Sequence, residues 1–186
     1  MFSKEEIMEK TEYEVRILNI DPQAFIQKLE SLGATKEGDY HYRRCIFHFR
    51  PDIPEKWIRL RTNGKKTTLT IKHVQEKTIS GTKEKEIVVS DFEMTKDIIS
   101  DLLGYGPDTT QENKRTRYFL DGVELDIDTW PLIPTYVEIE GHSEAEVLET
   151  VKKLGYTESD CVTLDVQSVY QKIYGIDISN MPTLHF

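Results

Sequence analysis

Alternation of polar and apolar residues along short segments of the chain predicts a protein rich in β-strands. Successive side chains of a strand point to opposite faces of a sheet. In segment 11–20, Glu12, Glu14 and Arg16 therefore share one face, and Tyr13 and Val15 share the other. The same pattern predicts further strands at about residues 40–49, 57–62, 66–74, 83–89, 115–120, 123–129 and 136–140.

Other segments have the period and the end signals of helices. Asp21 and Pro22 provide an N-cap and a first-turn proline, and Gly33 is a stop signal. Ser143 and Glu146 fit a capping box for a later helix. The predicted helices cover about residues 22–32, 91–103, 143–155 and 164–174.

The order of these segments predicts the fold class. Asn63-Gly64 and Asp121-Gly122 are strong signals for tight hairpin turns. Strands joined by hairpins form an antiparallel sheet, and about eight strands is the number at which a sheet can close on itself. We therefore predict an α+β fold: an eight-stranded antiparallel closed β-barrel flanked by helices. The chain has 186 residues without an internal repeat or linker, so one domain over residues 1–186 is expected.

Composition limits the classes of partner. The net charge is −9 and the pI about 5.1, which argues against a general nucleic-acid binder. No window approaches the roughly 18 apolar residues of a membrane span, and the N-terminus lacks the apolar stretch of a signal peptide. The two cysteines, Cys45 and Cys161, do not form a metal-binding motif. A cytoplasmic protein without a nucleic-acid or membrane partner is expected.

The charged strand faces have two interpretations. An antiparallel sheet commonly leaves its polar face in water, and any single pair of alternating acids is usually such a face. Here, however, the charges are segregated by sign: Arg59 and Arg61 lie on one strand, and acids lie on others. A closed barrel with its apolar faces outward would enclose these charges in a tunnel, where each needs a counter-ion. Arginine suits phosphate oxygens, and carboxylates suit Mg²⁺ or Mn²⁺.

Several motifs, in order, resemble the CYTH family, also called the triphosphate tunnel metalloenzymes. That family includes class IV adenylyl cyclases, thiamine triphosphatases and inorganic triphosphatases. Its hallmark Glu-x-Glu-x-Lys resembles residues 12–16, with Arg16 in place of the lysine. The aspartate often found in its second strand is missing from residues 43–47, and the loop 130–134 replaces the more usual glycine-containing turn. The other matching motifs, between residues 11 and 141, are Arg59-Leu60-Arg61, Leu69-Thr70-Ile71-Lys72, Lys83-Glu84-Lys85-Glu86, Arg115-Thr116-Arg117, and Asp128 followed by Glu138-Ile139-Glu140.

The resemblance implies roles for individual residues and a Mg²⁺ or Mn²⁺ cofactor. On the loosely matched acidic strand, Glu86 is preferred to Glu84, and Asp126 is a weaker candidate than Asp128. The implied catalytic residues are Glu12, Glu14, Arg16, Glu86 and Asp128. The implied substrate ligands are Arg16, Arg59, Arg61, Lys72, Arg115 and Arg117. The implied metal ligands are Glu12, Glu14, Asp128, Glu138 and Glu140.

The function expected from the resemblance is metal-dependent hydrolysis of inorganic triphosphate or of a nucleoside or other organic triphosphate. The first alternative is a class IV type adenylyl cyclase that converts ATP to cyclic AMP and pyrophosphate. Hydrolysis is preferred because the cyclase additionally needs a nucleobase pocket. The second alternative is a non-catalytic binder of polyphosphate or nucleotide, which has little use for several carboxylates beside an anion. The expected partner is a small-molecule triphosphate; a homodimer, and closure of one tunnel end by the last helix, are left open.

Overall fold

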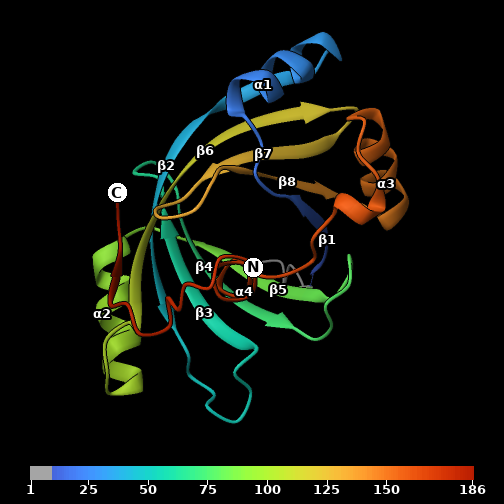
Figure 1. Ribbon diagram of the computed structural model, residues 1–186. Helices are drawn as coiled ribbons and strands as arrows, with labels where there is room; N and C mark the ends of the chain where they lie inside the picture. The colour runs from blue at the N-terminus through green and yellow to red at the C-terminus, as the bar shows by residue number, and fades with distance from the viewer. Residues whose placement is uncertain (1–9) are drawn as a thin grey trace, which may run out of the picture.

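Eight antiparallel strands form a closed ring in the computed structural model, which describes residues 10–186 (Figure 1). Around the ring the strand order is β2-β3-β4-β5-β1-β8-β7-β6, and pairing of β2 with β6 closes it. A short ninth strand, β9 (Thr183–Leu184), pairs in parallel with β6. The eight barrel strands are β1 (Lys10–Ile17), β2 (Thr35–Phe47), β3 (Lys56–Thr62), β4 (Thr67–Val74), β5 (Thr82–Val89), β6 (Thr109–Leu120), β7 (Val123–Thr129) and β8 (Tyr136–Gly141).

Strand β1 is shared between its two neighbours along its length. Residues 10–12 pair with β5, and residues 13–17 pair with β8. Where β1 leaves β5, two other segments take over its hydrogen bonds. The backbone N–H of Glu14 donates to the carbonyl of Ile79 at 3.0 Å, and Arg16 and Val162 exchange two backbone hydrogen bonds of 2.8 Å. The C-terminal segment around Val162 is therefore part of the barrel wall.

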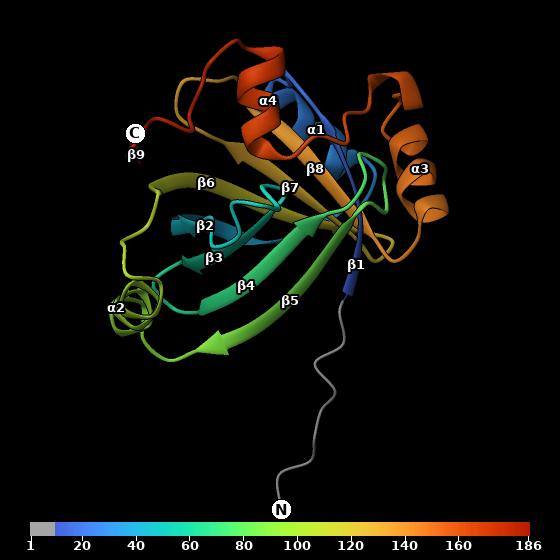
Figure 2. The same cartoon turned by 90° about the horizontal axis from the view of Figure 1, so that it is seen from below.

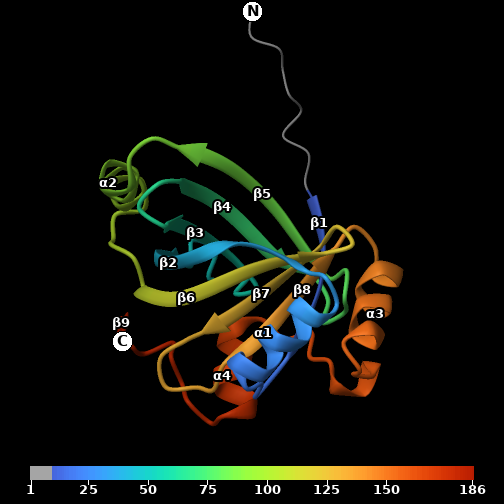
Figure 3. The same cartoon turned by 90° about the horizontal axis from the view of Figure 1, so that it is seen from above.

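The outer faces of the strands carry the apolar residues, and helices cover them. Helices α1 (Pro22–Ser31) and α3 (Glu144–Lys153) lie outside the ring over β7, β8 and β1 (Figure 3). There Leu29 and Val147 pack with Val15, Leu125 and others in the largest buried cluster. Side chains on the opposite faces of the same strands must then point into the barrel. This arrangement confirms the predicted α+β barrel with its apolar faces outward.

Helix α2 (Phe92–Leu103) covers a second outer patch, next to β2 and β3 (Figures 2 and 3). Phe92 and Ile99 pack against Cys45, Phe47 and Leu60. These strand residues alternate with Arg44 on β2 and with Arg59 and Arg61 on β3, so burying the apolar set outward fixes the arginines inward. The register of each strand is thus determined by its apolar face.

Helix α4 (Val166–Ile173) lies at one end of the barrel, near β7 and β8 (Figure 2). A 3-10 turn (Glu158–Asp160) precedes it. Val169 and Tyr170 pack with Trp130 and Tyr136, and the Tyr170 hydroxyl donates to the carbonyl of Pro131 at 2.5 Å. The polar residues Gln167 and Gln171 line the interior cavity instead. The last helix therefore borders one end of the tunnel.

The element boundaries differ from the predictions in a few places. Strand β2 begins at Thr35 rather than near residue 40, and β6 begins at Thr109 rather than near 115. The first residues of each strand pair with the other strand, but their sequence does not alternate between apolar and polar residues. Strand β1 ends at Ile17, shortly before Asn19, whose φ of 58° is incompatible with a strand. Ser143 caps α3 as predicted, but Glu146 reaches His142 rather than the Ser143 backbone. None of the described helices has the length and apolar character needed to span a membrane.

Candidate active site

A cavity of about 670 Å³ occupies the barrel interior and is lined by charged side chains from all eight strands. Helix α4 borders this cavity through Gln167 and Gln171. The structure places every residue of the predicted site on this cavity. The predicted residues on its wall are Glu12, Glu14, Arg16, Arg59, Arg61, Lys72, Glu86, Arg115, Arg117, Asp128, Glu138 and Glu140.

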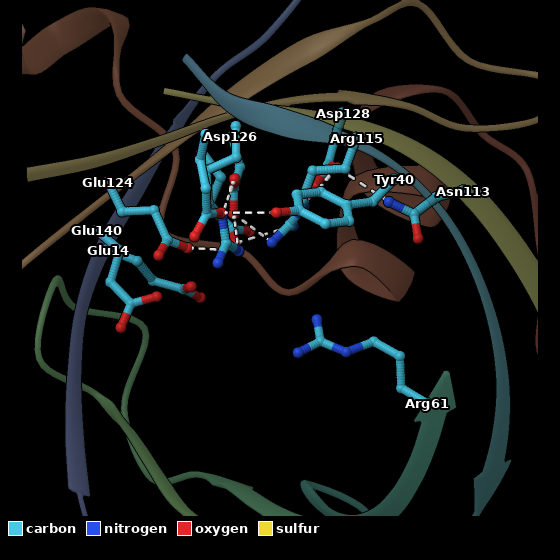
Figure 4. A network of polar contacts seen from close by, with 12 residues as sticks. Glu14, Tyr40, Arg61, Asn113, Arg115, Glu124, Asp126, Asp128 and Glu140 are labelled. Carbon is cyan, nitrogen blue, oxygen red and sulfur yellow. Dashed lines mark hydrogen bonds and ion pairs between the residues drawn. The ribbon is translucent and has the colours of Figure 1, made fainter. Parts of the chain in front are cut away.

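Three acids on neighbouring strands form a group suited to a metal ion. Each of Glu12, Glu14 and Glu140 offers one carboxylate oxygen, and these oxygens lie within 4.8 Å of one another. The cross-strand pairing of Glu14 with Glu140 brings two of them together (Figure 4). Oxygen Oε2 of Glu12 is buried without a hydrogen bond of acceptable geometry, although Nζ of Lys72 lies 2.9 Å away. A buried carboxylate oxygen with spare capacity fits a hard divalent cation.

Burial and like charge affect the titration of these acids. Burial raises the pKa of Glu14 to about 7, and the nearby charges of Glu138 and Glu12 add to that effect against the opposing charge of Arg16. Burial also raises the pKa of Glu12, against the opposing charge of Lys72. A cation bound beside such a carboxyl would favour its ionised form and offset the effects that raise its pKa.

Arg16 links the acidic strands to the C-terminal segment. Its Nη2 donates to Glu14 at 3.0 Å and to Glu138 at 2.5 Å, and its Nη1 donates to the carbonyl of Leu164 at 2.7 Å. Burial raises the pKa of Glu138, but the charges of Arg16 and Arg115 outweigh that effect and hold the pKa below its ordinary value. Glu138 is therefore ionised at neutral pH and held by arginine, outside the three-glutamate group.

A second ion-pair network occupies β6, β7 and β8. Nε and Nη2 of Arg115 donate to the two carboxylate oxygens of Asp128 at 2.8 and 2.5 Å, and Nη1 bonds to Asp126. Arg117 donates to both oxygens of Asp126 at 2.8 Å and contacts Glu124 at 2.6 Å. Asp126 is thus buried between two arginines, and it does not line the cavity. In this structure the predicted ligands Arg115, Arg117 and Asp128 are therefore paired with oppositely charged residues of the same wall, formed by β6, β7 and β8.

The opposite wall, formed by β3 and β4, is less completely neutralised. The closest carboxylate contacts of Arg59 are 3.5 Å to Glu86 and 3.7 Å to Glu84, and the closest of Arg61 is 4.0 Å to Glu86. Figure 4 shows the Arg61 guanidinium directed into the open interior. Burial and the charges of Arg59 and Arg115 lower the pKa of Arg61 to about 10. These arginines retain donors that can bind an anion.

Both candidate acids of β5, Glu84 and Glu86, face the cavity. Glu86 accepts a hydrogen bond of 2.7 Å from the Thr70 hydroxyl. Burial opposes ionisation of Glu86, but this hydrogen bond and the charges of Arg59 and Arg61 lower its pKa. Glu84 lies 3.7 Å from Lys72. The two acids therefore orient the basic side chains of β3 and β4.

Sequence reasoning missed several inward residues. Arg44 and Tyr42 come from β2, Asn113 comes from β6, and Trp130 directly follows β7. Arg44 packs on the Trp130 ring, and Arg61 packs on the Tyr42 ring. One signal could have identified Arg44: it alternates with Cys45 and Phe47, whose apolar side chains predict the outer face. Asn113 had no such signal, because the predicted strand began after it.

The comparisons with known proteins agree with this geometry. The model of the CYTH domain family matches residues 10–163. No curated protein sequence matches the chain. Among solved structures, a conserved hypothetical protein from Pyrococcus furiosus has 25% sequence identity and a TM-score of 0.71, and the match covers 84% of this chain and 98% of that one.

Two further solved structures share the fold at lower identity. A Vibrio parahaemolyticus protein proposed to be an adenylate cyclase has a TM-score of 0.72 at 10% identity, with 91% of this chain and 100% of that one covered. A Hippeastrum protein proposed to be an adenylyl cyclase, for which a dominant triphosphatase activity is described, has a TM-score of 0.56 at 16% identity, with 90% and 96% covered. At such identities the likeness supports the fold.

Proposed function

Because the chain belongs to the CYTH domain family, we propose that it is a metal-dependent triphosphatase that hydrolyses inorganic triphosphate or a nucleoside or other organic triphosphate. One observation carries the proposal. A closed pore presents a group of three glutamates on β1 and β8, and guanidinium groups with spare donors on β3. Such a pore suits a polyanion bound together with a cation.

The metal site of this proposal consists of Glu12, Glu14 and Glu140, with Asp128 and Glu138 as the other proposed ligands. Their all-oxygen donor set fits Mg²⁺ or Mn²⁺. When bound, such a cation offsets the charge that develops on the phosphate oxygens during transfer. Glu138 is fixed by Arg16, and Asp128 by Arg115 and Asn113, so both hold defined positions before any ligand enters.

The phosphate chain is proposed to lie against the basic side chains. Arg59 and Arg61 come from alternate positions of β3, and Lys72 pairs across the strands with Trp57, on the same face as Arg59. Arg16, Arg115 and Arg117 are the other proposed ligands, with orientations set by their carboxylate partners. Guanidinium groups bind phosphate oxygens through two parallel hydrogen bonds, which fixes the reacting phosphorus atom. Burial in the pore limits the access of water other than the attacking molecule.

The chemical step of the proposal is hydrolysis of one phosphoanhydride bond. A water oxygen forms a bond to phosphorus as the bridging oxygen leaves with its electron pair, and the proton that the attacking water loses passes to the solvent. Inorganic triphosphate then yields phosphate and pyrophosphate, and a nucleoside triphosphate yields phosphate and the diphosphate. The proposed catalytic residues are Glu12, Glu14, Arg16, Glu86 and Asp128, which orient the metal site and the phosphate ligands.

Product analysis tests the proposal directly. The purified protein is incubated with tripolyphosphate, and separately with ATP, with Mg²⁺, with Mn²⁺ and with EDTA. Metal-dependent release of orthophosphate is the expected result. Cyclic AMP with pyrophosphate from ATP would identify a cyclase instead, and intact substrate in every reaction would identify a binding protein. Either of these outcomes overturns the proposed hydrolysis.

A further inference from the structure

Arg44 of β2 is a buried arginine without an acidic partner. Its residue is 6% exposed and lines the cavity. Among residues 10–186 it forms no ion pair with a carboxylate, whereas Arg43, the preceding residue on the outer face, contacts Glu93 at 2.8 Å. A buried charge without a counter-ion is costly. Its position therefore calls for an anion supplied from outside the chain.

Neighbouring side chains hold Arg44 in one orientation. Its guanidinium lies 4.5 Å above the ring of Trp130, and its Nη2 donates to Oδ1 of Asn113. Asn113 is itself oriented, because its Nδ2 donates to Asp128 at 2.9 Å. Nε of Arg44 is buried and has no hydrogen-bond partner. The side chain is thus fixed with donors to spare.

The electrostatic surroundings of Arg44 are those of an anion site. Arg44 pairs across the strands with Arg61, and Arg59 follows on the same face of β3. Burial, followed by the charges of Arg61, Arg59 and Arg115, lowers the pKa of Arg44 to about 9, and Asp128 offsets only part of this effect. Buried like charges on adjacent strands destabilise the ligand-free protein. A bound polyanion removes that repulsion.

We propose that Arg44 is a phosphate ligand, which forms with Arg59 and Arg61 a three-arginine subsite on the β2–β3 wall. This inference deepens the proposed function and rests on it. In the ring of eight strands, β2 and β1 are four places apart in both directions, so they face each other across the pore (Figure 1). The subsite therefore holds its phosphate from the side opposite the β1 acids Glu12 and Glu14. Contact with Arg44 does not require the metal.

Binding of inorganic tripolyphosphate to full-length protein, measured by calorimetry in EDTA and again with Ca²⁺, tests the subsite. Arg44→Met is expected to weaken tripolyphosphate binding about 10- to 100-fold in both conditions, the effect of losing one bidentate charge-assisted contact. The matched control is Arg43→Met, which removes the neighbouring arginine from the outer face and should leave the affinity unchanged. Arg44→Lys keeps the charge without the planar fork and should show a smaller loss, about 3- to 10-fold.

Thermal unfolding separates a ligand role from a structural one. If Arg44 serves the anion, ligand-free Arg44→Met should unfold at the wild-type temperature or above it, and should gain less than wild type when tripolyphosphate is added. Wild-type affinity for tripolyphosphate in both Arg44→Met and Arg44→Lys overturns the subsite. If Arg61→Met nevertheless loses binding, the proposed function stands without a role for Arg44. A wild-type protein that neither binds nor hydrolyses tripolyphosphate overturns the proposed function itself. If Arg44→Met does not fold, the affinity of Arg44→Lys decides the question.

Discussion

Arg115 and Asp128 form a bidentate ion pair inside the barrel, with contacts of 2.8 and 2.5 Å from Nε and Nη2 to the two carboxylate oxygens. Asp128 is 0% exposed, and burial raises its pKa against the opposing effect of Arg115. A predicted phosphate ligand and a predicted metal ligand are thus each other's counter-ion in the ligand-free protein. Binding of phosphate and metal can therefore be coupled. A phosphate that binds Arg115 frees Asp128 for a metal ion, and a metal ion that binds Asp128 frees Arg115 for a phosphate.

Asp128→Asn should destabilise the protein. The variant keeps the shape of the side chain but removes the charge that Arg115 faces. Arg115 then has only Asp126 and Glu138 as acidic partners among the described residues. We expect the free energy of unfolding to fall by about 1–3 kcal/mol, measured by urea denaturation. Asp52→Asn is the control: Asp52 pairs with Arg50 on the surface and should change stability by less than about 0.5 kcal/mol. Equal stability of Asp128→Asn and wild type would contradict the buried-pair account.

Glu140→Ala should abolish metal-dependent phosphate release while leaving the fold intact. Glu140 belongs to the three-glutamate group, and its ion pair with Lys10 is solvent-exposed. Turnover of tripolyphosphate should fall by about 10²-fold or more. Glu149→Ala, on the exposed side of α3, is the control and should retain wild-type turnover.

Glu138→Ala should lose the same activity for a different reason. Glu138 bonds to Arg16 and Arg115, so its removal also leaves two buried guanidinium groups with fewer partners. Activity and thermal stability should therefore both fall in Glu138→Ala, whereas only activity falls in Glu140→Ala. Wild-type turnover in both variants is incompatible with the proposed metal site.

The barrel could be predicted from the sequence because the alternation is regular wherever one face is buried and the other lines the pore. Val137 and Ile139 alternate with Glu138 and Glu140, and the register follows directly. Pairing between charged residues could not be predicted. Whether Arg115 meets Asp128 or a ligand depends on the register of β6 against β7 and on rotamers. Arg44 was missed because the neighbouring positions on its face of the strand, Tyr42 and Ile46, carry no charge, so β2 lacks the alternating pair of charges that marks the other strands.

The stability of the protein should depend on Glu124 as the pH rises. Burial, with the charge of Asp126, raises the pKa of Glu124 from 4.5 to about 8, although Arg117 lies 2.6 Å away. The folded state then holds a proton that the unfolded state releases above about pH 4.5. This contribution is fully present below pH 4.5 and is lost as the pH rises towards 8. Its size is on the order of 2 kcal/mol, given the partial exposure of the side chain.

Glu124→Gln isolates this effect. The variant cannot ionise, so its stability relative to wild type should increase between pH 5 and 8 in urea denaturation experiments at about one-unit intervals. Glu149→Gln, at an exposed position of α3, should follow the wild-type curve. A constant difference between Glu124→Gln and wild type over this range would show that Glu124 titrates normally.

Arg16→Lys should loosen the C-terminal segment from the barrel. Arg16 contacts Glu14, Glu138 and the Leu164 carbonyl at once, through two different nitrogens. A lysine has a single nitrogen on a flexible stem and cannot span both carboxylates and that carbonyl. The lost charge-assisted bond should make amide hydrogen exchange in residues 162–173 about 10-fold faster or more, because exchange there follows local opening of the segment. Exchange across the β2–β6 pairing should be unchanged, since no contact of Arg16 reaches it.

Arg43→Lys is the control for this prediction. Arg43 lies on the outer face of β2, and its replacement should leave the exchange of residues 162–173 as in wild type. If Arg16→Lys gives the same protection there as wild type, the two backbone bonds between Arg16 and Val162 suffice to hold the segment, and the arginine serves the pore alone.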